Sequence, residues 1–489
     1  MKKTILILLC VIMALPLFAG GGRQSGSASG ASELVWYVGG NGPQPDTPAV
    51  LAEANRYLAE KLNVRLNIIE TDWGNYEQKM QMVTASREVY DMCFTANWIN
   101  NFYTNVSRNA YLELDDLINR HAPGLKADMP SNGWDAAKVG GRIYAVPNQQ
   151  IWAGTNALFV GKSYLDRYNI NPASINDLSA VESLLALIKR DNPNMYPLAC
   201  CSFDNPFVNL WLNMGLDLLS GSNIPGAVLL NDSSLKVINQ YELPQVQAMF
   251  RLMRQWYQRG YMRPDAATVS DYVPDIIAGR HALDISGTIK PGVEIEAQNG
   301  WGGREVAAIP MSSTWLTTSG ITATMNAISR TSRNPDKAMQ FLNLINTDKY
   351  LYNLITQGIE GRHYTRIDAN YIRPVANSAY NPEADWMYGN QFLAYFKEGQ
   401  DRNIWDDTKK LNVSARPSPA LGFAFDPTPV NTEIAGVNSV TDEYLVNLAV
   451  GAVDPDTVLP VFLERLRSAG SQRIIDEIQR QLDAWKATR

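Results

Sequence analysis

Residues 34–68 alternate between strand-like and helix-like segments. Residues 34–38 are a short β-rich run that ends in the loop Gly39-Gly-Asn-Gly-Pro43. Apolar residues then recur at helical spacing over 48–62, and an alternating strand-like pattern follows at 64–68. Strand, helix and strand in this order predict a parallel sheet, with functional loops at the carboxyl ends of its strands.

The alternation continues beyond this unit. We predict helices at 76–86, 113–120, 183–190, 244–259, 335–346 and 472–486, and strand-like segments at 90–95, 138–147, 196–201, 281–286, 307–310 and 321–328. A chain of 489 residues is longer than one hydrophobic core usually serves, so two domains or lobes are expected.

The first residues have the pattern of a secretory signal. Lys2 and Lys3 precede an apolar run over 5–18 and then Ala19-Gly20. We predict a signal peptide at 1–19 and a flexible Gly/Ser-rich leader at 20–32. A lipoprotein would carry Cys where Gly20 stands, and Cys10 lies inside the apolar run. A freely diffusing periplasmic protein is therefore predicted, with a membrane-tethered lipoprotein as the alternative.

Composition excludes several classes of function. The net charge is -6, with acidic and basic residues mixed, so nucleic acid is not an expected partner. The three His residues have no second His at ligand spacing, so neither a metal site nor His-based catalysis is expected. By contrast, 12 Trp, 22 Tyr and 13 Phe supply many aromatic faces.

Three cysteines remain after the predicted cleavage. Cys93, Cys200 and Cys201 are an odd number and cannot form a complete disulfide framework. We predict small buried thiols. A strained disulfide between the neighbours Cys200 and Cys201 is the alternative in an oxidising compartment.

Several motifs carry a family resemblance. The segment 134–147 (Trp-Asp-Ala-Ala-Lys-Val, then Gly-Arg-Ile-Tyr-Ala-Val-Pro) resembles the crossover segment of extracellular solute-binding proteins of ABC sugar importers, family 1. Residues 334–346 resemble the helix after their return crossover. Residues 353–364, 422–426 and 479–485 resemble the LipO-type branch, which has a distinctive C-terminal domain. The resemblance covers about residues 33–489.

The resemblance implies a two-lobed, type II-like periplasmic-binding-protein fold of the α/β class, with hinge crossovers and a mostly helical C-terminal extension. Lobe 1 would comprise 33–146 and 303–346, and lobe 2 would comprise 147–302 and 347–489. Such a monomer closes on a ligand between its lobes and delivers it to the transmembrane subunits of an ABC permease. It is not an enzyme and has no cofactor.

An oligosaccharide is the expected ligand. A sugar presents an apolar face and a rim of hydroxyl groups, so its site needs flat aromatics and a few polar side chains. Predicted strand-end loops and one C-terminal segment have this composition. The candidate ligand-binding residues are Asn41, Trp73, Asn97, Trp98, Asn148, Gln149, Trp152, Asp204, Phe207, Thr288, Trp386 and Asn390. Each also has a structural interpretation as a turn, hinge or core residue, and Trp36 is expected in the core.

Two other functions stay open. A secreted glycoside hydrolase also has aromatic clefts and paired carboxylates, but the pairs Asp115-Asp116 and Asp406-Asp407 are sequence neighbours and cannot flank a bond. A periplasmic sensor subunit would use the same closed form as a transport protein. The sequence does not separate sensing from transport.

Overall fold

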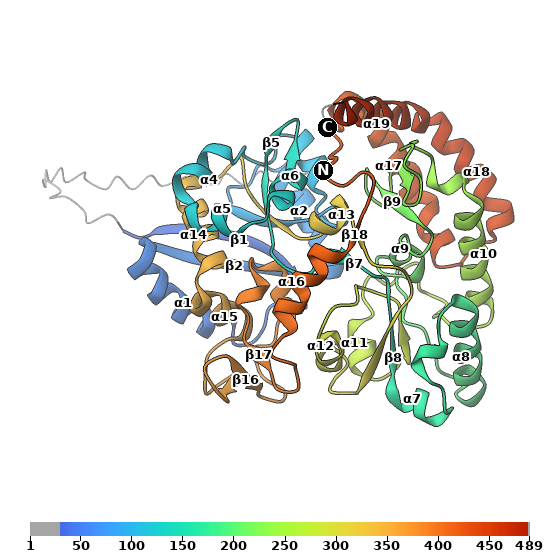
Figure 1. Ribbon diagram of the computed structural model, residues 1–489, viewed down its shortest axis with the longest axis horizontal. Coiled ribbons are helices and arrows are strands. Elements are labelled where there is room, and N and C mark those ends of the chain that lie inside the picture. Colours follow the sequence, from blue (N-terminus) through green and yellow to red (C-terminus); the bar gives the residue numbers. More distant parts are fainter. Residues whose placement is uncertain (1–29, 488–489) are drawn as a thin grey trace, which may run out of the picture.

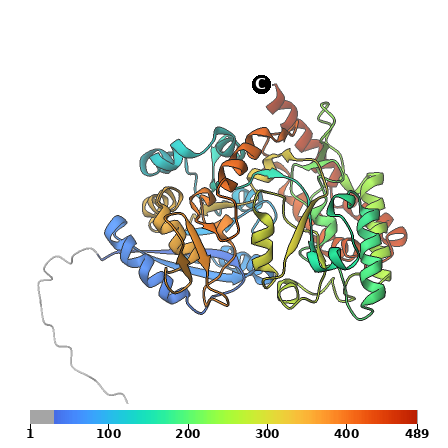
Figure 2. The same ribbon diagram turned by 60° about the horizontal axis from the view of Figure 1, so that its bottom comes forward.

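Two separate hydrophobic cores organise residues 30–487, the part of the chain that the computed structural model describes. The first core contains buried residues from 34–153 and 316–415, and the second contains buried residues from 158–311 and 420–482. We call these parts lobe 1 and lobe 2. They lie side by side in Figure 1 and again after rotation in Figure 2. The architecture confirms the predicted two-lobed α/β fold.

The lobes divide the chain differently from the expected boundaries in three places. Residues 147–153 belong to lobe 1, because Ile151, Trp152 and Ala153 are part of its core. Residues 303–311 belong to lobe 2, because β12 (Val306–Pro310) pairs with β8 (Ala157–Gly161). Residues 349–415 supply buried side chains such as Tyr352 and Trp405 to the core of lobe 1. The chain therefore crosses between the lobes near 311–318 and 415–420, and not at the expected boundaries 302/303 and 346/347.

Lobe 1 is built on a five-stranded sheet in the order β2-β1-β3-β14-β6. The strands are β1 (Ser32–Gly40), β2 (Val64–Asp72), β3 (Met92–Thr95), β6 (Ala145–Pro147) and β14 (Met325–Ile328). β1 is parallel to β2 and β3, as the β-loop-α-β pattern predicts. β14 is antiparallel to both β3 and β6, so β6 runs in the same direction as β1. Trp36 is fully buried, as expected.

Helices and short strands surround this sheet. They are α1 (Thr47–Leu62), α2 (Trp73–Ala85), α3 (Phe102–Ser107), α4 (Asp115–His121), α5 (Pro123–Asp128), α6 (Ser131–Ala136), β4 (Lys138–Val139), β5 (Arg142–Ile143), α13 (Thr318–Ile321), α14 (Pro335–Thr347), α15 (Lys349–Gln357), β15 (Tyr364–Arg366), β16 (Tyr371–Pro374), β17 (Phe396–Lys397) and α16 (Ile404–Ser414). The strand predicted over 321–328 begins only at Met325. Residues 318–321 are helical because the Thr317 hydroxyl accepts a hydrogen bond from Gly320 N and caps the turn.

Lobe 2 has a three-stranded antiparallel sheet in the order β11-β8-β12. Its remaining elements are α7 (Lys162–Arg167), α8 (Leu178–Asp191), α9 (Pro206–Asn209), β9 (Leu216–Leu218), β10 (Ala227–Leu229), α10 (Pro244–Gln258), α11 (Val273–Ile277), β11 (Leu283–Asp284) and α12 (Val293–Gly300). The strand predicted at 196–201 is reduced to one bridge between Leu198 and Leu283. Cys93, Cys200 and Cys201 are buried free thiols, as predicted.

A small sheet joins the lobes. It consists of β7 (Ala153–Gly154), β13 (Trp315–Leu316) and β18 (Arg416–Pro417), with β13 in the centre. Each strand lies on one of three passages of the chain between the lobes. The Asn412 side chain fixes the first passage, because its Oδ1 accepts from Trp152 N and Ala153 N at 2.7 and 3.0 Å.

The C-terminal helices pack on lobe 2. α17 (Asn431–Ala449) and α18 (Pro455–Ser468) lie beside α10, and α19 (Ser471–Lys486) packs on both of them at the top of Figure 1. Their buried residues, among them Phe462 and Ile478, are continuous with the lobe 2 core. No helix within 30–487 has the length and apolar character needed to cross a membrane. The predicted signal peptide and most of the leader lie outside the described residues.

Candidate ligand-binding site

Four strands of lobe 1 end at the same edge of the sheet. β1, β2, β3 and β6 run in one direction, so their carboxyl ends meet there. The residues that follow these ends include the predicted site residues Asn41, Trp73, Asn97, Trp98 and Asn148. This edge is where open α/β sheets bind ligands.

Three tryptophans form an aromatic platform at this edge. The Trp73 and Trp386 rings stack with centroids 5.5 Å apart and planes inclined by 10°. Trp98 lies 5.7 Å from Trp73 and 6.4 Å from Trp386. Trp73 and Trp386 are half-buried and Trp98 is 38% exposed. Flat indole faces of this kind match the apolar face of a pyranose ring.

The end of β1 leaves room for the platform. A Cβ atom on Gly39 would lie 2.5 Å from Cζ3 of Trp73, which is closer than two carbon atoms approach. The absent side chain therefore lets the Trp73 ring lie directly on the backbone of β1. The glycine-rich loop of the sequence thus serves a close approach as well as a turn.

Hydrogen bonds fix the Trp98 loop. Trp98 Nε1 donates to the carbonyl oxygen of Ala323 at 2.7 Å. Asn97 Nδ2 donates to the carbonyl oxygen of Ser319 at 2.7 Å and to Thr322 Oγ1 at 3.2 Å. The amide donors of Asn97 are thus used within the protein, and their structural effect is to hold Trp98 in place.

Lobe 2 reaches the platform through Phe203. Its ring centroid is 5.8 Å from that of Trp98, and the two residues belong to different lobes. A second contact joins the lobes beside Trp73, where a Cβ on Gly74 would lie 2.7 Å from Ser270 Oγ. The two lobes therefore touch at the aromatic platform.

Glu70 is a half-buried carboxyl group near the same sheet edge. It stands at the end of β2, and a Cβ on Gly40 would lie 2.5 Å from its Oε1. Oε1 is buried and has no hydrogen-bond partner among the described residues. Burial raises the pKa of Glu70 to about 7. No sequence motif marked this residue.

Comparisons with known proteins agree with this geometry. The model "Domain of unknown function (DUF3502)" matches residues 419–487. A carbohydrate ABC transporter substrate-binding protein of Streptococcus pneumoniae is 27% identical over 452 residues, which are 91% of this chain and 89% of the relative. The chain is thus similar over nearly its whole length to a carbohydrate substrate-binding protein of an ABC transporter.

Solved structures show the same fold over nearly the whole chain. The N-glycan transport solute-binding protein NgtS of S. pneumoniae, in complex with Man5GlcNAc, is 25% identical with a TM-score of 0.83, covering 94% of this chain and 99% of that one. A second NgtS structure, whose description names no glycan, is 26% identical with a TM-score of 0.77, and the match covers 93% of this chain and 98% of that one. The alginate-binding protein AlgQ2 has the same fold at 16% identity and a TM-score of 0.64, covering 93% and 99%.

Within this solute-binding fold, several predicted site residues hold the hinge. Asn148 Oδ1 accepts from Asn326 Nδ2 at 2.9 Å, and Asn148 Nδ2 donates to the carbonyl oxygen of Trp386 at 3.2 Å. Trp152 is buried and its Nε1 donates to the Asn148 carbonyl at 2.9 Å. Asn148 therefore positions Trp386 from behind.

The remaining hinge candidates pair with each other or with backbone. Gln149 and Asn390 form a β-bridge, and both are buried. Thr288 Oγ1 accepts from Thr155 N at 2.8 Å and so attaches the 286–290 loop to the first crossing. In these contacts Gln149, Asn390 and Thr288 are structural residues of the hinge, which is the alternative that the sequence left open for them.

The last three candidates divide between the loops and the core. Asn41 Nδ2 donates to the Pro382 carbonyl at 3.3 Å, which connects the β1 loop to the segment that carries Trp386. Asp204 adjoins Phe203, and its Oδ2 accepts from Tyr272 Oη at 2.7 Å. Phe207 is fully buried and stacks on Phe250 in the core of lobe 2. It does not line the cleft, because the short helix α9 turns it inward.

Lys290 connects the lobes near the hinge. Lys290 of lobe 2 is buried and its Nζ lies 2.8 Å from Glu296 Oε2. The same Nζ lies 3.4 Å from Oε1 of Gln391, which packs with lobe 1. A buried Lys needs such partners, since an unpaired charge there is costly. Sequence spacing gave no signal for this contact.

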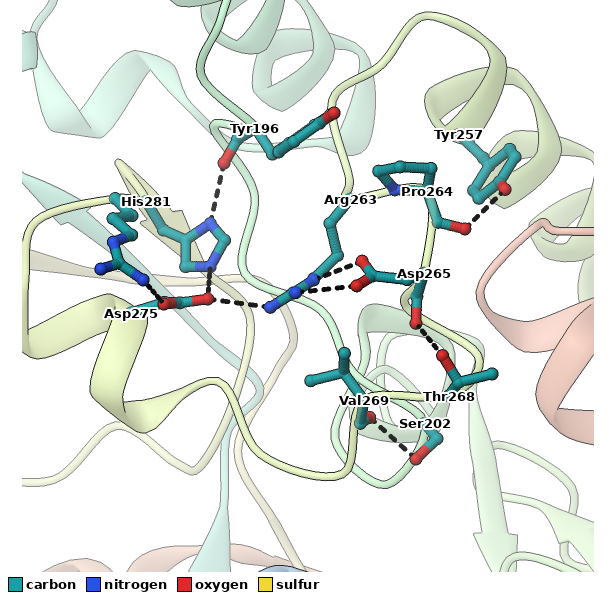
Figure 3. Close-up of polar contacts among 11 residues, drawn as sticks. Tyr196, Ser202, Tyr257, Arg263, Pro264, Asp265, Thr268, Val269, Asp275 and His281 are labelled. Atoms are coloured by element: carbon teal, nitrogen blue, oxygen red, sulfur yellow. Dashed lines mark hydrogen bonds and ion pairs between the residues drawn. The ribbon is translucent and has the colours of Figure 1, made fainter.

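A separate cavity of about 980 Å³ lies at the far edge of lobe 2, lined by residues such as Tyr196, Arg263 and Asp275. Arg263 Nη1 donates to Asp275 Oδ2 at 2.8 Å, and Arg280 Nη1 donates to Asp275 Oδ1 at 2.5 Å (Figure 3). His281 Nδ1 lies 2.8 Å from the Tyr196 carbonyl oxygen, and burial lowers the pKa of His281. The charges of this cluster neutralise one another, which is the arrangement of a structural network.

Proposed function

We propose that this protein captures an oligosaccharide between its lobes and delivers it to the transmembrane subunits of an ABC importer. The observation that carries the proposal is the platform of Trp73, Trp98 and Trp386 at the carboxyl edge of the lobe 1 sheet, with Phe203 of lobe 2 opposite. Such a cleft offers stacking faces from both lobes. Closing the lobes would then complete the site.

The ligand we propose is an oligosaccharide of neutral sugars. NgtS, which is similar over nearly the whole chain, is described in complexes with Man5GlcNAc and Man1GlcNAc. Support in this chain comes from the carboxyl groups at the platform edge, Glu70 and Glu383. Burial raises the pKa of both, and an acidic sugar would add a further negative charge beside them.

Solute-binding proteins of ABC importers act outside the cytoplasm. For this chain we propose a monomer that diffuses freely in the periplasm after removal of residues 1–19, since Gly20 stands where a lipoprotein has Cys. Its relatives are substrate-binding proteins, and we propose binding without turnover. A sensor subunit that uses the same closed form is the second candidate.

Titration calorimetry of the mature protein with Man5GlcNAc tests the proposal. We expect one site per chain, and at a ligand concentration 100 times the Kd the free energy of unfolding should rise by about 2.7 kcal/mol. Chromatography of the recovered glycan should show no cleavage. Binding of peptides or polyamines without any glycan, or release of shorter sugars, would contradict the proposal.

A further inference from the structure

We propose that Glu70 determines which sugars the cleft accepts: its carboxylate receives hydrogen bonds from hydroxyl groups of a neutral sugar unit beside the Trp73–Trp386 pair, and it repels acidic sugars. The inference rests on the proposed function, since it assigns a role within the same cleft. Glu70 is not among the residues that the sequence motifs indicate, and its role follows from its position and its lack of partners.

The end of β1 positions the group. Gly39 and Gly40 are consecutive, and their missing side chains face opposite sides of the strand. A Cβ on Gly39 would meet the Trp73 ring and a Cβ on Gly40 would meet Oε1 of Glu70, each at 2.5 Å. The two glycines therefore make room for an aromatic ring on one face of the sheet edge and for a carboxyl group on the other, where Tyr380 and Tyr388 of the segment that carries Trp386 lie near it.

The carboxyl group has no partner in the protein. Glu70 makes no hydrogen bond and no ion pair with the described residues, and Oε1 is buried. Burial is the cause that raises its pKa to about 7. Buried polar groups in native proteins are nearly always hydrogen-bonded, because leaving one unpaired is costly. A carboxyl group without partners at a ligand site is therefore available to the ligand.

The charged and titratable neighbours favour a neutral ligand. Tyr380 and Tyr388 face Glu70 from the 380–388 segment, and the Glu70 charge contributes to raising the pKa of each phenol. Glu383 lies on the same segment and its pKa is also raised by burial, while Asp72 follows on β2. No Lys, Arg or His among residues 30–487 contributes to the pKa of Glu70. The charge of Lys397 acts on Glu383, but no cation acts on Glu70. A uronic acid would thus meet the Glu70 carboxylate without a compensating cation.

Ionised carboxylates accept stronger hydrogen bonds than neutral carboxyl groups. Affinity for a neutral glycan should therefore rise as the pH increases from 6 to 8, through the pKa of about 7. The Glu70→Gln variant keeps the shape and one acceptor but has no charge. It should bind the neutral glycan about 3- to 10-fold more weakly at pH 8 and show a flat pH profile between 6 and 8.

The experiment is calorimetry at pH 6, 7 and 8 with Man5GlcNAc and with a mannuronate oligosaccharide of similar length. The proteins are the wild type, Glu70→Gln, Glu70→Ala and the control Glu60→Gln, which changes an exposed carboxyl on α1. We expect Glu70→Ala to bind the neutral glycan about 10- to 100-fold more weakly, Glu70→Gln to gain affinity for the acidic sugar, and the control to match the wild type. Circular dichroism and thermal unfolding confirm that each variant is folded.

A second variant tests the geometry. Gly40→Ala should displace the Glu70 carboxyl and weaken binding in the wild-type background, but have little effect in the Glu70→Ala background. If the wild type binds neither glycan, the proposed function fails. If it binds the neutral glycan and both Glu70 variants match its affinity, pH profile and selectivity, the role of Glu70 alone is wrong.

Discussion

The Trp98 indole of lobe 1 and the Phe203 ring of lobe 2 face each other across the cleft, with their centroids 5.8 Å apart. Both rings are more than one-third exposed, at 38% and 37%. Two exposed aromatic rings in contact at the junction of the lobes form an apolar surface of the kind that binds ligands. Because Trp98 also contacts Trp73 and Trp386, it connects the stacking platform to the opposite lobe.

Replacing Trp98 should therefore weaken ligand binding more than replacing Phe203. Trp98→Ala removes a stacking face and the contact between the lobes, and we expect the affinity for Man5GlcNAc to fall about 10- to 100-fold, or roughly 1–3 kcal/mol. Phe203→Ala leaves the platform intact, so a loss of about 3- to 10-fold is expected. Titration calorimetry measures both.

The matched control is Tyr350→Ala. Tyr350 is 45% exposed on α15, and its ring lies 4.9 Å from that of Tyr57 of α1, within lobe 1. Its removal should leave the affinity unchanged. Equal affinities of Trp98→Ala and the wild type would show that the platform does not contact the sugar.

Much of lobe 1 could be predicted from the sequence, because local patterns dominate there. Regular alternation identified β1, α1 and β2, and parallel strands necessarily bring their carboxyl ends together. That rule is why Asn41, Trp73 and Trp98 lie near one another. Trp386 joins them although it is over 280 residues away along the chain, and only its polar-aromatic context marked it.

Other features depend on contacts distant in sequence. The hinge strands β7, β13 and β18 have two residues each, which is too short to give a periodic signal. The position of the third crossing, and with it the placement of 349–415 in lobe 1, could not be inferred for that reason. Phe207 was misassigned because a polar-aromatic loop can turn a ring toward the core as readily as toward a ligand. Glu70 belongs to no sequence motif, and only the three-dimensional structure shows that its carboxyl group has no hydrogen-bond or ion-pair partner among the described residues.

Asn412 should be important for the hinge. It accepts hydrogen bonds from Trp152 N and Ala153 N, and its Nδ2 donates to the Gln150 carbonyl at 2.7 Å. Asn412→Ala leaves these backbone groups unpaired, and we expect the free energy of unfolding to fall by about 2–3 kcal/mol. The lobes should also close less fully, which small-angle scattering reports as a larger radius of gyration.

Val413→Ala is the control on the same helix, because Val413 is 87% exposed. It should leave both the stability and the radius of gyration unchanged. A normal stability of Asn412→Ala in urea unfolding would contradict the role of Asn412 in fixing the first crossing.

Asp217 should make stability depend on pH. It is buried on β9, Ser418 Oγ donates to its Oδ2, and its Oδ1 has no partner among the described residues. Burial raises its pKa to about 6. The folded state therefore binds a proton more tightly than the unfolded state, and stability is lost as the pH rises from about 4 through 6.

The Asp217→Asn variant should remove this loss. At pH 8 its free energy of unfolding should exceed that of the wild type by up to about 3 kcal/mol, whereas at pH 4 the two should be equal. Urea unfolding at both pH values measures the difference. Asp476→Asn, which changes an exposed carboxyl on α19, should show no such dependence, and an equal effect of the two substitutions would refute the assignment.

Gly451 should hold the C-terminal helices against lobe 2. It follows α17 with φ of 72°, and a Cβ there would collide with the Met253 carbonyl oxygen of α10. Arg254 Nη1 donates to the Gly451 carbonyl at 3.0 Å, which fixes the same contact. Gly451→Ala should therefore lower the free energy of unfolding by about 3 kcal/mol or more, since backbone strain and a steric clash add.

Gly361→Ala is the matched control, because Gly361 has φ of 79° but open space around its Cβ position. It should lower the free energy of unfolding by only about 1–2 kcal/mol. Thermal and urea unfolding of both variants separate the two effects. Equal losses would mean that Gly451 serves only the turn and that the 419–487 domain does not depend on this close approach to α10.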